Sequence, residues 1–154
     1  MKNKEIFSVE PGVCQLMMHI LARCNRHVSR QLAPLGLTVQ TARVLMHVRL
    51  ARRARCREIA LGCGLEAAAL SHILSALLDK HLIERRRLAA DGRSVEVWLS
   101  QKGEGLADRC LAIARAQDEA ALAGFAAADA ERLRLLLERV ATNFKAERSD
   151  AKAA

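Results

Sequence analysis

The sequence predicts a mainly α-helical protein that carries one small β-hairpin. Along most of the 154-residue chain, apolar residues recur at the spacing of a helix. From Val95 to Leu99, apolar and polar residues alternate instead, as in a half-buried strand. Asp91-Gly92 precedes this stretch and favours a tight hairpin turn, because glycine tolerates a positive φ. The chain is 51% hydrophobic and 27% charged, which is typical of a globular domain rather than a disordered chain.

Six helices are expected, and a proline, a glycine or a capping residue marks most of their ends. The first covers about 11–33, and Pro34 and Gly36 end it. Thr38 is expected to cap the second, because its hydroxyl can accept a backbone hydrogen bond of the first turn. The inward positions of the second helix are Ala42, Leu45 and Val48.

Two short helices and a hairpin follow in the middle of the chain. The third helix is expected over about Arg55 to Leu61, and the fourth over Glu66 to Lys80, with a Gly-Cys-Gly turn between them. The hairpin consists of strands at Ile83–Leu88 and Ser94–Leu99. Two helices joined by a glycine-containing turn and followed at once by a hairpin are typical of a winged helix-turn-helix.

Two longer helices complete the chain. Ser100 is expected to cap the fifth, which breaks near Gly124, and Asp129 is expected to cap the sixth. The ends, 1–8 and 149–154, show no periodic pattern and are expected to be loose. The sixth helix carries an apolar stripe of Leu133, Leu136, Leu137, Val140 and Phe144.

Positive charge is concentrated around the predicted hairpin. The net charge is +8, and Gln40 to Lys102 hold twelve Lys/Arg against six Asp/Glu. Such a local excess favours a polyanionic partner, nucleic acid before membrane, since the chain has no basic amphipathic helix rich in Trp or Phe. No apolar run approaches the ~20 residues of a membrane span, and the first residues lack a signal-peptide core. We therefore expect a cytoplasmic protein without a membrane partner.

Three segments carry a resemblance to a known family. They are LGLTVQTARVLMHV (Leu35 to Val48), REIALGCGLEAAALSHILSALLDKHLIERRR (Arg57 to Arg87) and DGRSVEVWLSQKGEGL (Asp91 to Leu106). In this order they resemble the second helix, the DNA-reading helices and the wing of the MarR (multiple antibiotic resistance) family of bacterial regulators. Ser100 stands where the family's wing motif has threonine, and it keeps the capping chemistry.

The resemblance covers nearly the whole chain and implies a single domain over 1–154. In it, helices of about 11–33 and 101–148 form a homodimer, and a lobe of about 38–99 binds a pseudo-palindromic operator in double-stranded DNA. We expect a transcriptional repressor that a small aromatic acid effector releases. An enzyme is not expected, because the chain has no phosphate-binding glycine loop, acid pair or Ser/His/Asp set in a recognisable context, and no cofactor is implied.

Three groups of side chains are expected to meet the DNA. A projecting hairpin can reach the minor groove beside a helix that lies in the major groove, so Arg93 at its tip is expected to enter that groove, aimed by Asp91. The exposed face of the fourth helix would meet base edges, and two arginine clusters would meet phosphates. The helix residues are Ala68, Ser71, His72 and Ser75, and the clusters are Arg52, Arg53, Arg55 and Arg57, and Arg85, Arg86 and Arg87.

The fourth helix departs from the family pattern. His72 stands where the family usually has a basic residue, Ser75 and Ala76 replace a frequent acidic and basic pair, and His81 replaces a glycine. Side chains this short cannot make bidentate contacts with guanine. We therefore expect the affinity to come from phosphates, the wing and operator shape, and the operator to be degenerate.

Cysteines and histidines leave further interpretations open. Cys14 lies 24 residues before Thr38, which is similar to the register of the reactive cysteine in the peroxide-sensing branch of the family. That branch surrounds its thiol with tyrosines, and this chain has none. A redox-sensing regulator is thus one alternative, and packing is the other role considered for Cys14, as it is for the other four cysteines. A winged-helix module that binds protein or RNA is an alternative of another class.

The histidines have two interpretations of their own. His19, His27 and His47 could line an effector pocket, or each could be an ordinary core or surface histidine. Cys24 and His27 share a helix face, but no CxxC or HExxH motif completes a metal site, and none is expected.

Overall fold

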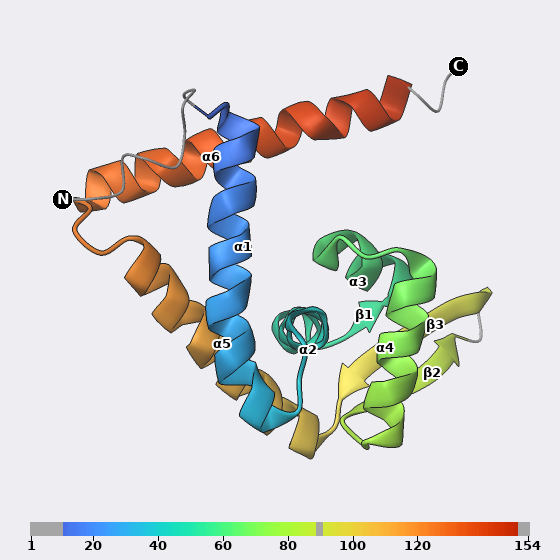
Figure 1. Cartoon of the computed structure of the whole chain (residues 1–154). Coiled ribbons are helices and arrows are strands. Elements are labelled where there is room, and N and C mark those ends of the chain that lie inside the picture. Colours follow the sequence, from blue (N-terminus) through green and yellow to red (C-terminus); the bar gives the residue numbers. More distant parts are fainter. Residues whose placement is uncertain (1–10, 89–90, 151–154) are drawn as a thin grey trace. The chain divides into compact units, whose positions relative to one another are not determined.

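A computed structural model describes the backbone of residues 11–88 and 91–150 and the side chains of 11–87 and 95–144 (Figure 1). The described chain is mainly helical with one small antiparallel sheet, as expected. It falls into two compact units that divide after Gln117. The elements are α1 (Val13–Leu32), a 3₁₀ turn η1 (Ala33–Leu35), α2 (Val39–Ala51), β1 (Ala54–Arg55), α3 (Cys56–Cys63), α4 (Ala67–Asp79), β2 (Ile83–Leu88), β3 (Asp91–Leu99), α5 (Gln101–Ala121) and α6 (Ala127–Asp150).

Helix α2 lies at the centre of the first unit. Thr38 caps it as expected, since its Oγ1 accepts the backbone N–H of Thr41 at 3.1 Å. The predicted inward residues are buried, and so is Val44, whose position the pattern did not indicate. Each other element of the unit except η1 adds side chains to the same core. Those with no more than 1% exposure are Leu32, Val44, Leu45, Val48, Ile59, Leu77, Val97, Ala107 and Cys110.

The sheet has one strand more than the hairpin that was expected. Its order is β1-β3-β2, with β3 antiparallel to both neighbours. Ala54 and Arg55 form β1 opposite Val97 and Glu96. A two-residue strand is too short to show alternation, and only its pairing with β3 makes it one, so the sequence did not predict it. Strand β3 also begins at Asp91, three residues earlier than predicted.

Two predicted helix boundaries need correction. Helix α6 begins at Ala127, so Asp129 lies in its first turn and is not its cap. An acidic side chain there still complements the positive end of the helix dipole, which explains the misleading signal. Helix α3 covers Cys56–Cys63 rather than ending at Leu61, because the left-handed residue that terminates it is Gly64, with φ +63°.

A tight joint connects α4, β2 and the start of α5. Helix α4 ends with the N–H of Leu82 bonded to the carbonyl of Leu77 at 2.9 Å, and His81 takes the left-handed position, φ +55°, that glycine usually fills. Ser100 donates its hydroxyl to the carbonyl of His81 at 2.8 Å and accepts the N–H of Gly103 at 3.1 Å. The predicted Ser100 cap therefore also fastens the end of α4 to α5.

Gly103 is required at this joint, whereas Gly105 on the same helix is not. A Cβ at Gly103 would lie 1.9 Å from the carbonyl oxygen of Leu82, but one at Gly105 meets nothing within 4 Å. We predict that Gly103→Ala lowers the free energy of unfolding by about 2 kcal/mol or more, because the backbone must shift. Gly105→Ala should raise it by about 0.5 kcal/mol, since alanine favours a helix. Urea denaturation followed by circular dichroism measures both, and equal effects would contradict the packing of this joint.

Candidate nucleic-acid interface

Helices α3 and α4 meet at 110° across a short turn, within the usual range for a helix-turn-helix. Glu58 fixes the start of α3, because its carboxylate accepts the backbone N–H of Arg55 at 2.8 Å. Helix α4 buries Leu70, Leu74 and Leu77 against the core. Its opposite face is exposed and carries the four side chains that the sequence assigned to base edges: Ala68, Ser71, His72 and Ser75.

The register of the hairpin determines which face of the sheet each of the three arginines of β2 lies on. Residues that pair across antiparallel strands share a face of the sheet. Arg85 and Arg87 pair with Val97 and Val95, on the face that packs toward the helices, and Arg86 pairs with Glu96 on the other face. All three arginines are exposed. Two of them therefore point to one side and one to the other, as alternation along a strand requires.

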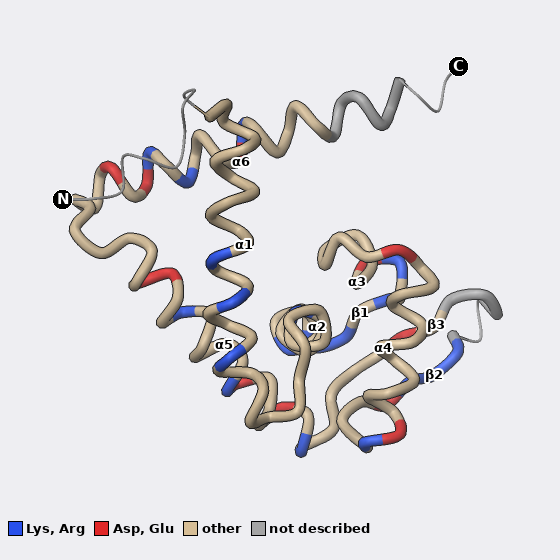
Figure 2. Tube along the Cα trace, viewed as in Figure 1, with Lys and Arg blue, Asp and Glu red and all other residues tan. Residues whose placement is uncertain are grey.

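The arginine cluster that follows α2 covers the link, β1 and the first turn of α3, where blue segments gather in Figure 2. Arg52, Arg55 and Arg57 are exposed. Arg53 is also exposed, but its side chain lies on the sheet: Nη1 is 3.3 Å from the Glu96 carboxylate and the guanidinium carbon is 5.4 Å from the centre of the Trp98 ring. The four arginines that the sequence grouped together are thus not equivalent.

The two residues predicted at the wing tip, Asp91 and Arg93, belong to β3 by their backbone. Their side chains lie outside the described residues. In Figure 1 the strands β2 and β3 extend past α4.

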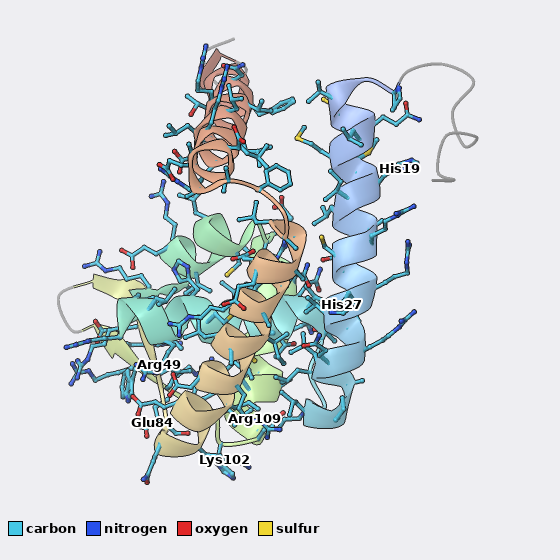
Figure 3. The ribbon with its side chains drawn as sticks, turned by 90° about the vertical axis from the view of Figure 1, so that its left-hand side faces the viewer. His19, His27, Arg49, Glu84, Lys102 and Arg109 are labelled. Atoms are coloured by element: carbon cyan, nitrogen blue, oxygen red, sulfur yellow. The ribbon has the colours of Figure 1, made fainter. Side chains whose placement is uncertain are left out.

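An ion pair that the sequence did not reveal joins α2 to α5. Arg49 donates from Nε and Nη2 to the two carboxylate oxygens of Asp108, at 2.9 and 3.4 Å. This hydrogen bond and the negative charge of Asp108 raise the pKa of Arg49. The two residues are 59 positions apart, so no local pattern could pair them. Figure 3 marks Arg49 in the group of charged residues where the lobe meets α5.

The histidines suggested for an effector pocket do not line one common cavity. His19 and His27 are exposed on α1 (Figure 3), and His27 shares a hydrogen bond of 2.8 Å with Gln31. His47 is half-buried on α2 and contacts the backbone of Gly62 so closely that a Cβ there would lie 2.3 Å from the ring. It lines an open groove of about 530 Å³ with Arg43, Met46, Leu61, Gly62, Cys63 and Gly64, which includes neither α1 histidine.

The thiols are spread over the structure rather than grouped. Cys63 and Cys110 are buried, Cys24 and Cys56 half-buried, and Cys14 exposed on α1. Burial raises the pKa of the Cys63 and Cys110 thiols, and it outweighs the opposite effects of Arg43 and Arg109. Within the described part of the chain, no three His, Cys, Asp or Glu side chains are placed to hold a metal ion.

Among the helices that the structure describes, none is by itself long and apolar enough to cross a membrane. Helices α3 and α4 are long and apolar enough only when they are taken together, and the pair is sharply bent.

An antiparallel hairpin behind a helix-turn-helix, on a core shared with α2 and α5, defines a winged helix-turn-helix protein. No protein-family model matches the chain. Its sequence is 27% identical over 128 residues to the HTH-type transcriptional repressor Rv2887 of Mycobacterium tuberculosis, covering 83% of this chain and 92% of the repressor. The corresponding repressor Mb2911 of Mycobacterium bovis matches equally well.

Solved structures agree with this similarity. The M. tuberculosis MarR family protein Rv2887, in complex with salicylic acid, has a TM-score of 0.67 at 26% identity, covering 87% of this chain and 99% of that one. A mutant MarR from Escherichia coli complexed with operator DNA has a TM-score of 0.73 at 23% identity, covering 83% and 92%. The transcriptional regulator SlyA reaches 0.82 at 15% identity, covering 89% and 96%. The chain is therefore similar in sequence to these repressors and shares the fold of solved MarR family structures.

The burial of two thiols predicts how fast each cysteine reacts with a thiol reagent. Because the thiolate is the reactive form and burial disfavours it, Cys63 and Cys110 should resist a thiol reagent at pH 8 while the protein is folded. Both should react fully after unfolding in guanidinium. Mass spectrometry of the labelled peptides measures this at each cysteine, with the unfolded chain as the control. Fast labelling of Cys110 in the folded state would contradict its burial.

Proposed function

We propose that the chain is a homodimeric transcriptional repressor that binds double-stranded DNA through its winged helix-turn-helix lobe. The observation that carries this proposal is the exposed face of α4, beside an arginine-rich hairpin, in a fold whose sequence relatives are named repressors. A helix of this width fits the major groove of B-DNA. The relatives' name also favours a regulator over an enzyme. A cytoplasmic location is part of the proposal, since the DNA to be bound lies there.

The proposed contacts follow from the positions of the side chains. Helix α4 would lie in the major groove with Ala68, Ser71, His72 and Ser75 toward the bases. Arg93, aimed by Asp91, would enter the neighbouring minor groove. Phosphate contacts would come from exposed arginines beside the hairpin, namely Arg52, Arg55, Arg57, Arg85, Arg86 and Arg87.

A dimer is supported by two apolar helix faces. Exposed apolar residues lie on α1 and, in the other unit, on α6. Contiguous apolar surface of this kind is normally covered by a partner, and a second copy of the same chain is the usual one. The residues concerned are Val13, Leu16, Ile20 and Leu21 on α1, and Leu133, Leu136, Leu137 and Phe144 on α6.

A small aromatic acid is the proposed effector, since the related Rv2887 was crystallised with salicylic acid. Of the three histidines considered for its pocket, His47 is the candidate that lines a groove, whereas His19 and His27 lie on α1 outside that groove. The effector would act by changing the distance between the two α4 helices of the dimer, so that they no longer match half-sites one helical turn apart. The bidentate pair of Arg49 and Asp108 supports this, because it couples the lobe to α5.

Selection of bound duplexes from random DNA tests this function. We predict that the recovered sequences contain two inverted half-sites centred about one helical turn apart. Salicylate should lower the recovery while the dimer stays intact on size-exclusion chromatography. A parallel arm with peroxide tests the redox alternative, in which Cys14→Ser would abolish the response. Recovery of no duplex at moderate salt would refute the proposal, and binding in a parallel selection from random RNA would favour the RNA-binding alternative instead.

Arg93 provides a residue-level prediction. Arg93→Gln should weaken operator binding substantially. It should also reduce the slope of log Kd against log salt by about one, because the protein then neutralises one DNA charge fewer. The matched control is Arg30→Gln, in the last turn of α1, which removes the same charge outside the lobe. Fluorescence anisotropy at several salt concentrations measures both slopes. An equal effect of the two substitutions would show that only net charge matters.

A further inference from the structure

A line of side-chain contacts runs across the outer face of the sheet, from the residue just before β1 over β3 to β2. Arg53, next to β1, covers the ring of Trp98 on β3 at 5.4 Å. Trp98 in turn donates its indole N–H to the Glu84 carboxylate on β2, at 3.2 Å. Both contacts run perpendicular to the strands. They therefore tie the two edges of the sheet to its central strand.

The backbone at this edge needs such support. Strand β1 has only two residues, so its pairing with β3 contributes few hydrogen bonds between the hairpin and the helical core. The link before it is strained: Arg52 has φ +63° and ψ −45°, and the N–H of Arg53 bonds back to the carbonyl of Ala51 at 2.7 Å. This is close to the γ-turn that non-glycine residues rarely adopt.

The charge of Arg53 is already compensated. Its Nη1 lies 3.3 Å from Glu96, whose side chain is 20% exposed, and Glu96 sits two residues before Trp98 on the same face of β3. A guanidinium that is paired with a carboxylate and stacked on an indole does not carry a free positive charge to a phosphate. Arg57, exposed on α3, forms no ion pair with the residues that the structure describes.

We infer that Arg53 is a positioning residue that holds the hairpin at a fixed angle to the helix-turn-helix, and not one of the phosphate contacts. It acts through Trp98 and Glu96: the cation–π contact and the ion pair fix β3 against the end of α2. The wing tip is the far end of β3, so a small rotation at Trp98 displaces the tip from the minor groove. This inference rests on the proposed DNA binding and assigns one arginine of its cluster a different role.

Trp98 is the chain's single tryptophan, so its fluorescence reports directly on this contact without DNA. In the free dimer, Arg53→Gln should shift the emission to longer wavelength and make it more easily quenched by acrylamide, because the ring loses its cover. Glu96→Gln should do the same more weakly, since it removes only the ion pair. The matched control, Arg57→Gln, should leave the emission unchanged. An unchanged emission in Arg53→Gln would overturn the inference.

Binding to the selected operator separates positioning from phosphate contact. Arg53→Gln should weaken binding about fivefold, the combined effect of an exposed cation–π contact and ion pair, and leave the salt slope unchanged. Arg57→Gln should lower that slope by about one. In a Trp98→Leu background, Arg53→Gln should cost less than about twofold, because the ring through which it acts is gone.

Two results would overturn the inference in this assay. One is a slope reduced by about one in Arg53→Gln, and the other is an equal loss of affinity in both backgrounds. Thermal unfolding of each variant confirms that the dimer is folded. If the wild-type protein binds no duplex, the proposed function fails, and the emission of Trp98 alone then decides whether Arg53 positions the hairpin.

Discussion

The burial of α2 is the constraint on which the first unit depends. Val44, Leu45 and Val48 are completely buried, and they share one core with the end of α1, with α3, α4 and β3, and with the first turns of α5. Because a close-packed core transmits strain, a displacement of one of these elements is passed on to the others. The core thus sets the position of α4 and of the base of the hairpin, and the Arg53 contacts on the outer face of the sheet add to it.

The charged residues lie on the surface around this core, and the arginines among them have two different environments. Some guanidinium groups are committed to carboxylates within the chain: Arg49 to Asp108, and Arg53 to Glu96. Others, such as Arg57 on α3, are exposed. Net charge alone cannot distinguish these roles, although it determines the long-range attraction of a polyanion. The number of cations available to phosphates is therefore smaller than the composition suggests.

Features whose cause is local were predictable. The Thr38 and Ser100 caps were found where the sequence indicated, since a cap depends on a hydroxyl and a few neighbouring residues. The apolar period placed α4 with its small polar face outward. The Asp129 cap was wrong because an acidic residue suits the first turn as well as the cap position. Strand β1 was missed because two residues have no period.

The sequence by itself determined the class of the protein: helical periods, a glycine turn and one alternating stretch specify a winged helix-turn-helix, and the order of the motifs accounts for the resemblance to MarR family regulators. Tertiary structure alone decided which side chains meet. Arg53 lies on Trp98, and Arg49 reaches Asp108, because the folded core brings together residues 45 and 59 positions apart. Periodicity and caps are properties of neighbouring residues, whereas these contacts exist only once distant segments share a core.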